Sequence, residues 1–143
     1  MDVSELRKKI LRALDEAKLE SASKRSEVDA AHRAYEQFLA NVAVPTLKQA
    51  QAILKAERRL FTVHAPAGGA KLLSDTEPQT FVEFLLDSST DQPTVLGRVS
   101  RARGRQRVLI DERPVAAGKS IDALTDEDVA AFLVTEIPRL VSR

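Results

Sequence analysis

Residues 3–42 read VSELRKKILRALDEAKLESASKRSEVDAAHRAYEQFLANV, and apolar side chains recur in this stretch every three and then four residues. Of the twelve positions in that repeat, nine are apolar, and the residues between them are rich in charge. This spacing is typical of a long helix that packs against another helix along its length. The repeat positions, called the seam below, are Val3, Arg7, Ile10, Leu14, Ala17, Ser21, Lys24, Val28, Ala31, Tyr35, Phe38 and Val42.

The length of this helix predicts that it extends beyond the rest of the molecule. At about 1.5 Å per residue it spans roughly 60 Å, more than the diameter of a small domain built from the remaining residues. Part of the seam is therefore expected to need a partner. The residues expected to form this association surface are Ile10, Leu14, Ala17, Val28, Ala31, Tyr35 and Phe38. The alternative is an amphipathic helix that packs entirely on its own domain.

Pro45 marks the expected end of the long helix. Proline disfavours helical backbone at the residue before it, Val44, so the helix is expected to end or kink there. A second helix with its own apolar stripe is expected from about Pro45 to Arg59. The link between the two is either a tight helical hairpin or a kinked continuation, and the absence of glycine favours the kink.

After Leu60 the apolar period changes to two, which is typical of β-strands. The sequence predicts an antiparallel meander of three strands, or four with a short strand at 61–65. The other strands are expected at 81–87, 95–102 and 106–111, with a loop from Pro66 through Pro78. A two-residue turn at Gly104 would place Val95, Val99, Val108 and Ile110 on one face of the sheet.

A helix-start signal follows the last strand. Thr125 is followed by Asp126, Glu127 and Asp128, so a hydroxyl and three carboxylates stand where the helix N-terminus needs acceptors and negative charge. The apolar stripe of this last helix is expected to cover the face of the sheet that carries Val82, Phe84, Val99 and Ile110. The predicted fold is α+β, with a helical association segment at 1–60 and a small head domain at 61–143.

Composition limits the functional classes. The 143 residues include no cysteine, which excludes disulfides and cysteine-ligated metal sites and fits a reducing cytoplasm. No apolar run is long enough to cross a membrane, so no membrane association is expected. The 22 basic and 21 acidic side chains nearly balance, which argues mildly against a dedicated nonspecific DNA binder.

No catalytic, metal or cofactor site is expected. Gly118, Lys119 and Ser120 resemble the end of a phosphate-binding loop, but the required glycine five residues before Gly118 is Arg113. The two histidines, His32 and His64, lie far apart in the sequence and have no cysteine partners. No set of residues supplies a nucleophile, a base and an anion hole together, so the protein is not expected to be an enzyme.

A cluster of arginines surrounds the predicted hairpin: Arg98, Arg101, Arg103, Arg105 and Arg107. A basic two-stranded ribbon can contact phosphates or a protein partner. The competing explanation is a solvated surface that is partly paired, with Arg98 opposite Asp111 and beside Glu83.

The sequence therefore favours a non-catalytic scaffold or adaptor, associated through its N-terminal helix with a second copy or another helical protein, and docking a partner on its head. The alternative is a small dimeric nucleic-acid-binding protein that uses the arginine-rich hairpin. The partner's identity and the orientation of helix pairing stay open at this point.

Overall fold

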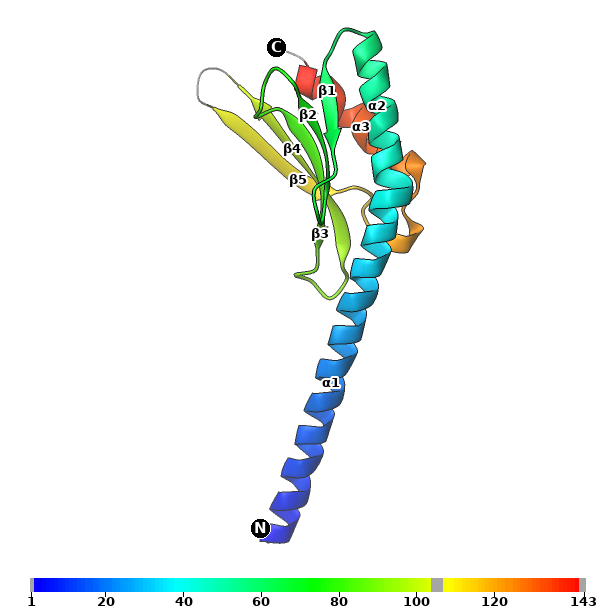
Figure 1. The fold of residues 1–143 in the computed structure, drawn as a ribbon. Helices are drawn as coiled ribbons and strands as arrows, with labels where there is room; N and C mark the ends of the chain where they lie inside the picture. The colour runs from blue at the N-terminus through cyan, green and yellow to red at the C-terminus, as the bar shows by residue number, and fades with distance from the viewer. Residues whose placement is uncertain (1, 104–106, 142–143) are drawn as a thin grey trace.

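The computed structural model describes residues 2–103 and 107–141. The fold is α+β, as predicted: a long N-terminal helix, an antiparallel sheet and a C-terminal helix (Figure 1). Helix α1 (Val3–Phe38), a π-helical turn (Leu39–Ala43) and α2 (Val44–Ala56) follow one another as one uninterrupted helical rod. The first half of this rod projects away from the rest of the molecule, and the N-terminus lies at its far tip.

The helix neither stops nor reverses at Pro45, so the expected second helix is the continuation of the first. A proline in a helix lacks the N–H donor, and its ring collides with the carbonyl four residues earlier, here Asn41. The π-helical turn accommodates this residue because the Val44 N–H reaches back five residues to the Leu39 carbonyl, which widens the turn locally. Pro45 thus sits in the first turn of α2, where its missing donor is tolerated.

The sheet has five strands rather than three or four. They run in sequence order, each antiparallel to the next: β1 (Phe61–His64), β2 (Ala70–Ser74), β3 (Phe81–Asp87), β4 (Thr94–Ala102) and β5 (Val108–Pro114). The strand that was not predicted is β2, which falls inside the expected loop. Its residues alternate in burial, with Ala70, Leu72 and Ser74 turned inward, so it fills the core between β1 and β3.

The register of the last hairpin differs from the predicted one by a single residue. Ala102 pairs with Val108 and Val99 pairs with Asp111, so Arg103 and Arg107 flank a three-residue connection instead of a two-residue turn. Because side chains alternate between faces, this change turns β5 over. Val95 and Val99 face the core as expected, whereas Val108 and Ile110 lie on the opposite face and are 37% and 58% exposed.

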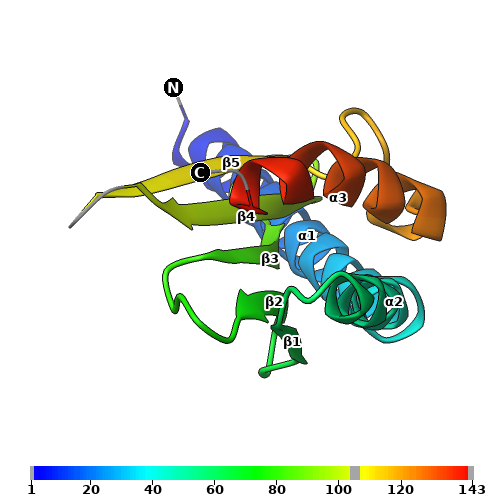
Figure 2. The ribbon, with the colours of Figure 1, turned by 90° about the horizontal axis from the view of Figure 1, so that it is seen from above.

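All helices lie on one face of the sheet (Figure 2). Helix α2 packs against β1 and β2, and α3 (Asp126–Val141) packs against β4, as expected for the C-terminal helix. Phe84, at the centre of the core, makes edge contacts with Phe38 of α1 at 6.2 Å and Phe132 of α3 at 5.9 Å between ring centroids. The core therefore takes in residues from both sides of position 60.

Helix α3 begins as its sequence predicts. The Thr125 hydroxyl accepts from the Asp128 N–H, and the Asp128 carboxylate accepts from the Thr125 N–H in return. Hydrogen bonds from Lys119 and Thr125 hold the pKa of Asp128 below its usual value. The helix continues through Pro138 to Val141.

Candidate functional site

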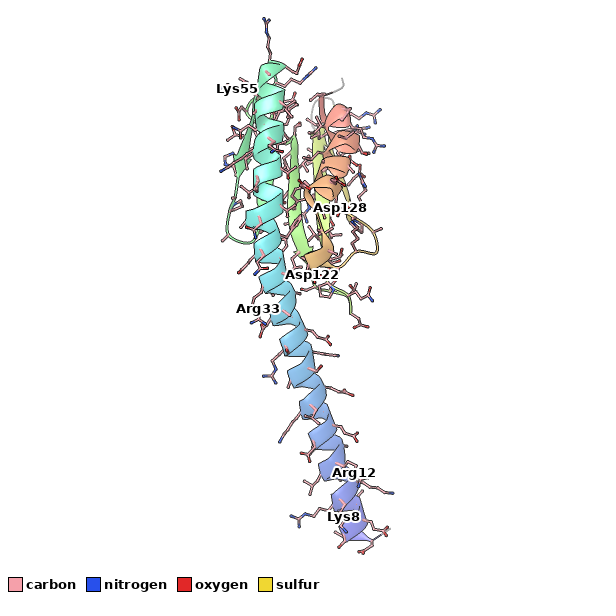
Figure 3. The ribbon with its side chains drawn as sticks, turned by 90° about the vertical axis from the view of Figure 1, so that its right-hand side faces the viewer. Lys8, Arg12, Arg33, Lys55, Asp122 and Asp128 are labelled. Carbon is pink, nitrogen blue, oxygen red and sulfur yellow. The ribbon has the colours of Figure 1, made fainter. Side chains whose placement is uncertain are left out.

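The helical rod is uncovered along its N-terminal half, as far as the described part of the chain shows. All residues from Asp2 to Ala30 are exposed. The large apolar residues of the seam are included, since Ile10 is 51% exposed, Leu14 53% and Val28 39%. Figure 3 shows the side chains of this half, Lys8 and Arg12 among them, extending outward on all sides of the helix. We refer to residues 2–30 as the free rod.

The head covers the same seam from Ala31 onward. Ala31 is partly buried, Tyr35 is 2% exposed and Phe38 is 3% exposed, all within one chain. Of the predicted association surface, Tyr35 and Phe38 therefore belong to the core, and Ala31 packs against it. The other four, Ile10, Leu14, Ala17 and Val28, remain on the free rod and are exposed.

Tyr35 fixes the point where the rod leaves the head. Its hydroxyl lies 2.9 Å from the Gly68 carbonyl and 3.1 Å from the Phe84 carbonyl, so its proton is shared between two acceptors of the head. Burial, with a smaller contribution from the charge of Glu83, raises the pKa of Tyr35 to about 12. The phenol therefore stays protonated and bonded at physiological pH.

Within the predicted arginine cluster, Arg98 forms ion pairs, whereas Arg101, Arg103 and Arg107 form none with other described residues. Arg98 forms ion pairs with Glu83 at 3.5 Å and with Glu112 at 2.6 Å, so its charge is compensated. Glu83 was the expected neighbour, whereas Glu112 takes the place predicted for Asp111 because of the shifted register. Arg107 is exposed immediately before β5, and Arg105 lies outside the described residues.

Arg101 and Arg103, at the end of β4, line a cavity of about 800 Å³ together with Arg58 and Arg59, which follow α2. The C-terminal ends of α2 and α3 lie at this same end of the molecule (Figure 1), and Leu140 and Val141 of α3 contribute to the wall. Glu77 is the acidic residue among the described residues of the lining, and it accepts a hydrogen bond from Thr80. We call this cavity the basic cleft.

Sequence reasoning identified only half of the basic cleft. Arg58 and Arg59 carry no distinctive signal, because basic residues are common after the C-terminus of a helix, where they face its negative end. They line the same cavity as Arg101 and Arg103 because the antiparallel order of the strands brings the start of β1 and the end of β4 to one end of the sheet.

The face of the sheet opposite the helices is uncovered and mixed in character (Figure 2). Phe81, Leu85 and Leu96 are partly exposed there, and the Lys71 ammonium lies 3.9 Å from the centre of the Phe81 ring. The ion pairs of Arg98 cross the same face. Apolar and charged side chains are therefore both accessible on this face.

The described residues, 2–103 and 107–141, contain no cluster of three or more histidine or acidic side chains that could hold a metal ion. Within the same residues, no helix combines the length and apolarity needed to span a membrane. Comparison with protein-family models, curated proteins and solved structures gave no match to this chain.

Proposed function

We propose that this protein is a non-catalytic assembly factor that pairs through its free rod with a second copy of itself and presents its head to a further partner. The observation that carries the proposal is the change in the seam at Ala31. After Ala31 in the sequence the seam residues pack in or against the core. Before it the same apolar repeat runs back to Val3 and is exposed to solvent. Isolated helices derive little stability from propensity alone, so an exposed seam of this length gains most from a partner helix.

A second copy fits the free rod in length. The rod spans about 29 residues, or roughly 43 Å, before the head begins. In an antiparallel pair the whole free rod of each chain lies along that of the other, and each tip reaches the base of the opposite head. Such a dimer has twofold symmetry, so it is a closed assembly that needs no third chain.

The position of the head favours the antiparallel orientation. The helix continues without a break from Val3 to Ala56, and the head occupies the seam side of its second half. In a parallel pair, a partner helix that followed the seam past Val28 would run into that head. Antiparallel pairing avoids the collision because only the tips approach the heads.

The test compares two leucines of the free rod. Leu14 lies on the seam and is 53% exposed, whereas Leu19 lies off the seam and is 70% exposed. We expect a concentration-dependent dimer in sedimentation equilibrium, abolished by Leu14→Asp and preserved by Leu19→Asp. A wild-type chain that stays monomeric at high micromolar concentration would contradict self-association, as would equal effects of the two substitutions.

A second candidate function, nucleic-acid binding, is favoured by one observation: Arg101 and Arg103 have no ion-pair partner in the described part of the chain. Such binding would weaken steeply as salt increases, because phosphate contacts release counterions. A gel-shift series with single- and double-stranded DNA and RNA at low salt tests it. A complex lost on replacing Arg103 and Arg107 by glutamate would support the hairpin as the contact.

A further inference from the structure

We infer that the basic cleft binds a small ligand carrying two or more linked phosphate groups, such as inorganic tripolyphosphate or the triphosphate of a nucleotide. This site lies on the head, away from the free rod, so the inference goes beyond the proposed assembly function and does not depend on it.

The first argument is uncompensated charge. Among the described residues, four arginines and one glutamate line the cleft, and together they carry a formal charge of +3. No ion pair joins any of the four arginines to another residue among those described. Elsewhere on the head, Arg98 and Arg113 are both paired with glutamates. Guanidinium groups suit phosphate oxygens because their planar donors can form two parallel hydrogen bonds.

The second argument is the backbone of Arg58. Its φ angle is +61°, in the left-handed region, where it ends α2: the Arg59 N–H donates to the Leu54 carbonyl and the Arg58 N–H to the Lys55 carbonyl. Glycine is the usual residue at this position, and any other side chain strains the backbone there. Because backbone hydrogen bonds alone form this turn, the turn does not require an arginine side chain. A strained arginine that lines a cavity therefore indicates a role for its side chain.

The third argument concerns size. A volume of about 800 Å³ lies in the range of small-molecule sites. Beyond the arginines and Glu77, the described lining is apolar or hydroxylic, with Leu140, Val141 and Thr76 among its residues. An extended single strand of nucleic acid would require a basic groove with aromatic platforms for its bases. Phe61, the aromatic residue of the lining, is only 8% exposed, so a compact phosphate chain fits this cleft better.

The experiment is isothermal titration calorimetry of the full chain at low salt with three probes: tripolyphosphate, ATP and a single-stranded DNA 12-mer. We expect tripolyphosphate and ATP to bind, with affinity that falls as salt increases. Tighter binding of ATP would assign the ligand to nucleotides, and equal binding would assign it to the phosphate chain alone. Binding of the DNA without either small probe would overturn the inference in favour of nucleic acid, and no binding of any probe would also overturn it.

Three variants locate the binding. Replacing Arg101 and Arg103 by alanine should weaken tripolyphosphate binding by about tenfold or more, because each lost charge-assisted hydrogen bond is worth about that factor. Arg107→Ala is the matched control, since Arg107 is an exposed arginine of the same hairpin that does not line the cleft. An equal loss in that control would place the binding at the hairpin tip instead.

Arg58→Gly separates binding from folding. Glycine adopts the left-handed conformation without strain, so this variant should be at least as resistant to thermal unfolding as the wild type. Its affinity for tripolyphosphate should nevertheless fall, by about fivefold or more. Unchanged affinity in a folded Arg58→Gly chain would remove Arg58 from the site and contradict the argument from strain.

Discussion

The hydroxyl of Tyr35 lies 3.1 Å from the carbonyl oxygen of Phe84, a residue 49 positions later at the centre of the sheet. Phe84 also touches Phe38 and Phe132, so the hydrogen bond ties the base of the free rod to the middle of the core. These contacts fix the base of the rod to the head, so a partner helix that pairs with the rod as proposed would be held in a defined position relative to the head.

The ionisation of Tyr35 is directly measurable, because the chain has one tyrosine and no tryptophan. Burial raises its pKa from the ordinary 10.0 to about 12. We expect tyrosinate absorbance to appear with a midpoint near pH 12 in the folded chain and near pH 10 in denaturant. Because the folded pKa is the higher, this group's contribution to stability is complete below pH 10 and is lost as the pH rises to 12.

Tyr35→Phe serves as the control for that measurement. It removes the hydrogen bonds to two carbonyls, so the free energy of unfolding at neutral pH should fall by about 1–2 kcal/mol. The wild type should also lose its advantage over the variant between pH 10 and 12. A folded-state midpoint near pH 10 would show that the phenol is not buried and bonded as described.

The class and order of the fold follow from the sequence because helical and strand periods are strong local signals. The register of the last hairpin does not follow from the sequence, because Gly104 indicates that a turn is present but not how many residues it contains. One additional residue in the connection places Asp111, in place of Ile110, on the helix side of β5. The core tolerates this because Arg113, on that same side, pairs with Glu136 and lies over Phe132.

The two features that the sequence does not predict, β2 and half of the basic cleft, depend on tertiary structure. Residues 70–74 are too short to show a period, and they become a strand because β1 and β3 lie on either side. The length of the helix, in contrast, is enough to predict the free rod, since a domain cannot cover a helix longer than itself.

Gly97 is required by close packing against α3. A Cβ atom at this position would lie 2.2 Å from the Phe132 ring, in the middle of the core. Gly97→Ala should lower the free energy of unfolding by about 3 kcal/mol, measured by urea denaturation. Gly69→Ala, where the added atom meets its neighbour at 3.4 Å, should change it by less than about 1 kcal/mol.

A second substitution keeps this prediction testable if Gly97→Ala fails to fold. Adding Phe132→Leu removes the ring that the new methyl group would strike, so the double variant should recover part of the lost stability. If both glycine variants behave alike, the packing of Phe132 on Gly97 is not tight.

Glu136 is a buried carboxylate, 5% exposed at its side chain, and its partner Arg113 bonds it at 2.9 Å. Removing one partner of a buried pair leaves the other charge uncompensated. We expect Arg113→Met to lower the free energy of unfolding by about 2–3 kcal/mol, and Arg113→Met with Glu136→Met to restore much of it. Arg98→Met, which breaks the more exposed pairs, should have an effect below about 1 kcal/mol. The assignment fails if the two single variants are equally stable.

The orientation of the paired rods can be read from a single spin label, because the chain has no cysteine and Ser4→Cys creates one at the tip of the free rod. In an antiparallel pair the two labels are separated by most of the overlap, about 35–45 Å along the axis at the helical rise per residue. In a parallel pair in register they lie side by side, less than about 20 Å apart at the spacing of packed helices. Double electron–electron resonance distinguishes the two ranges, and the label lies outside the seam.

We expect the long distance, because the head closes the seam at Ala31 to a parallel partner. A dimer that shows the short distance would mean that the two helices separate below the heads, and the antiparallel arrangement would then be wrong.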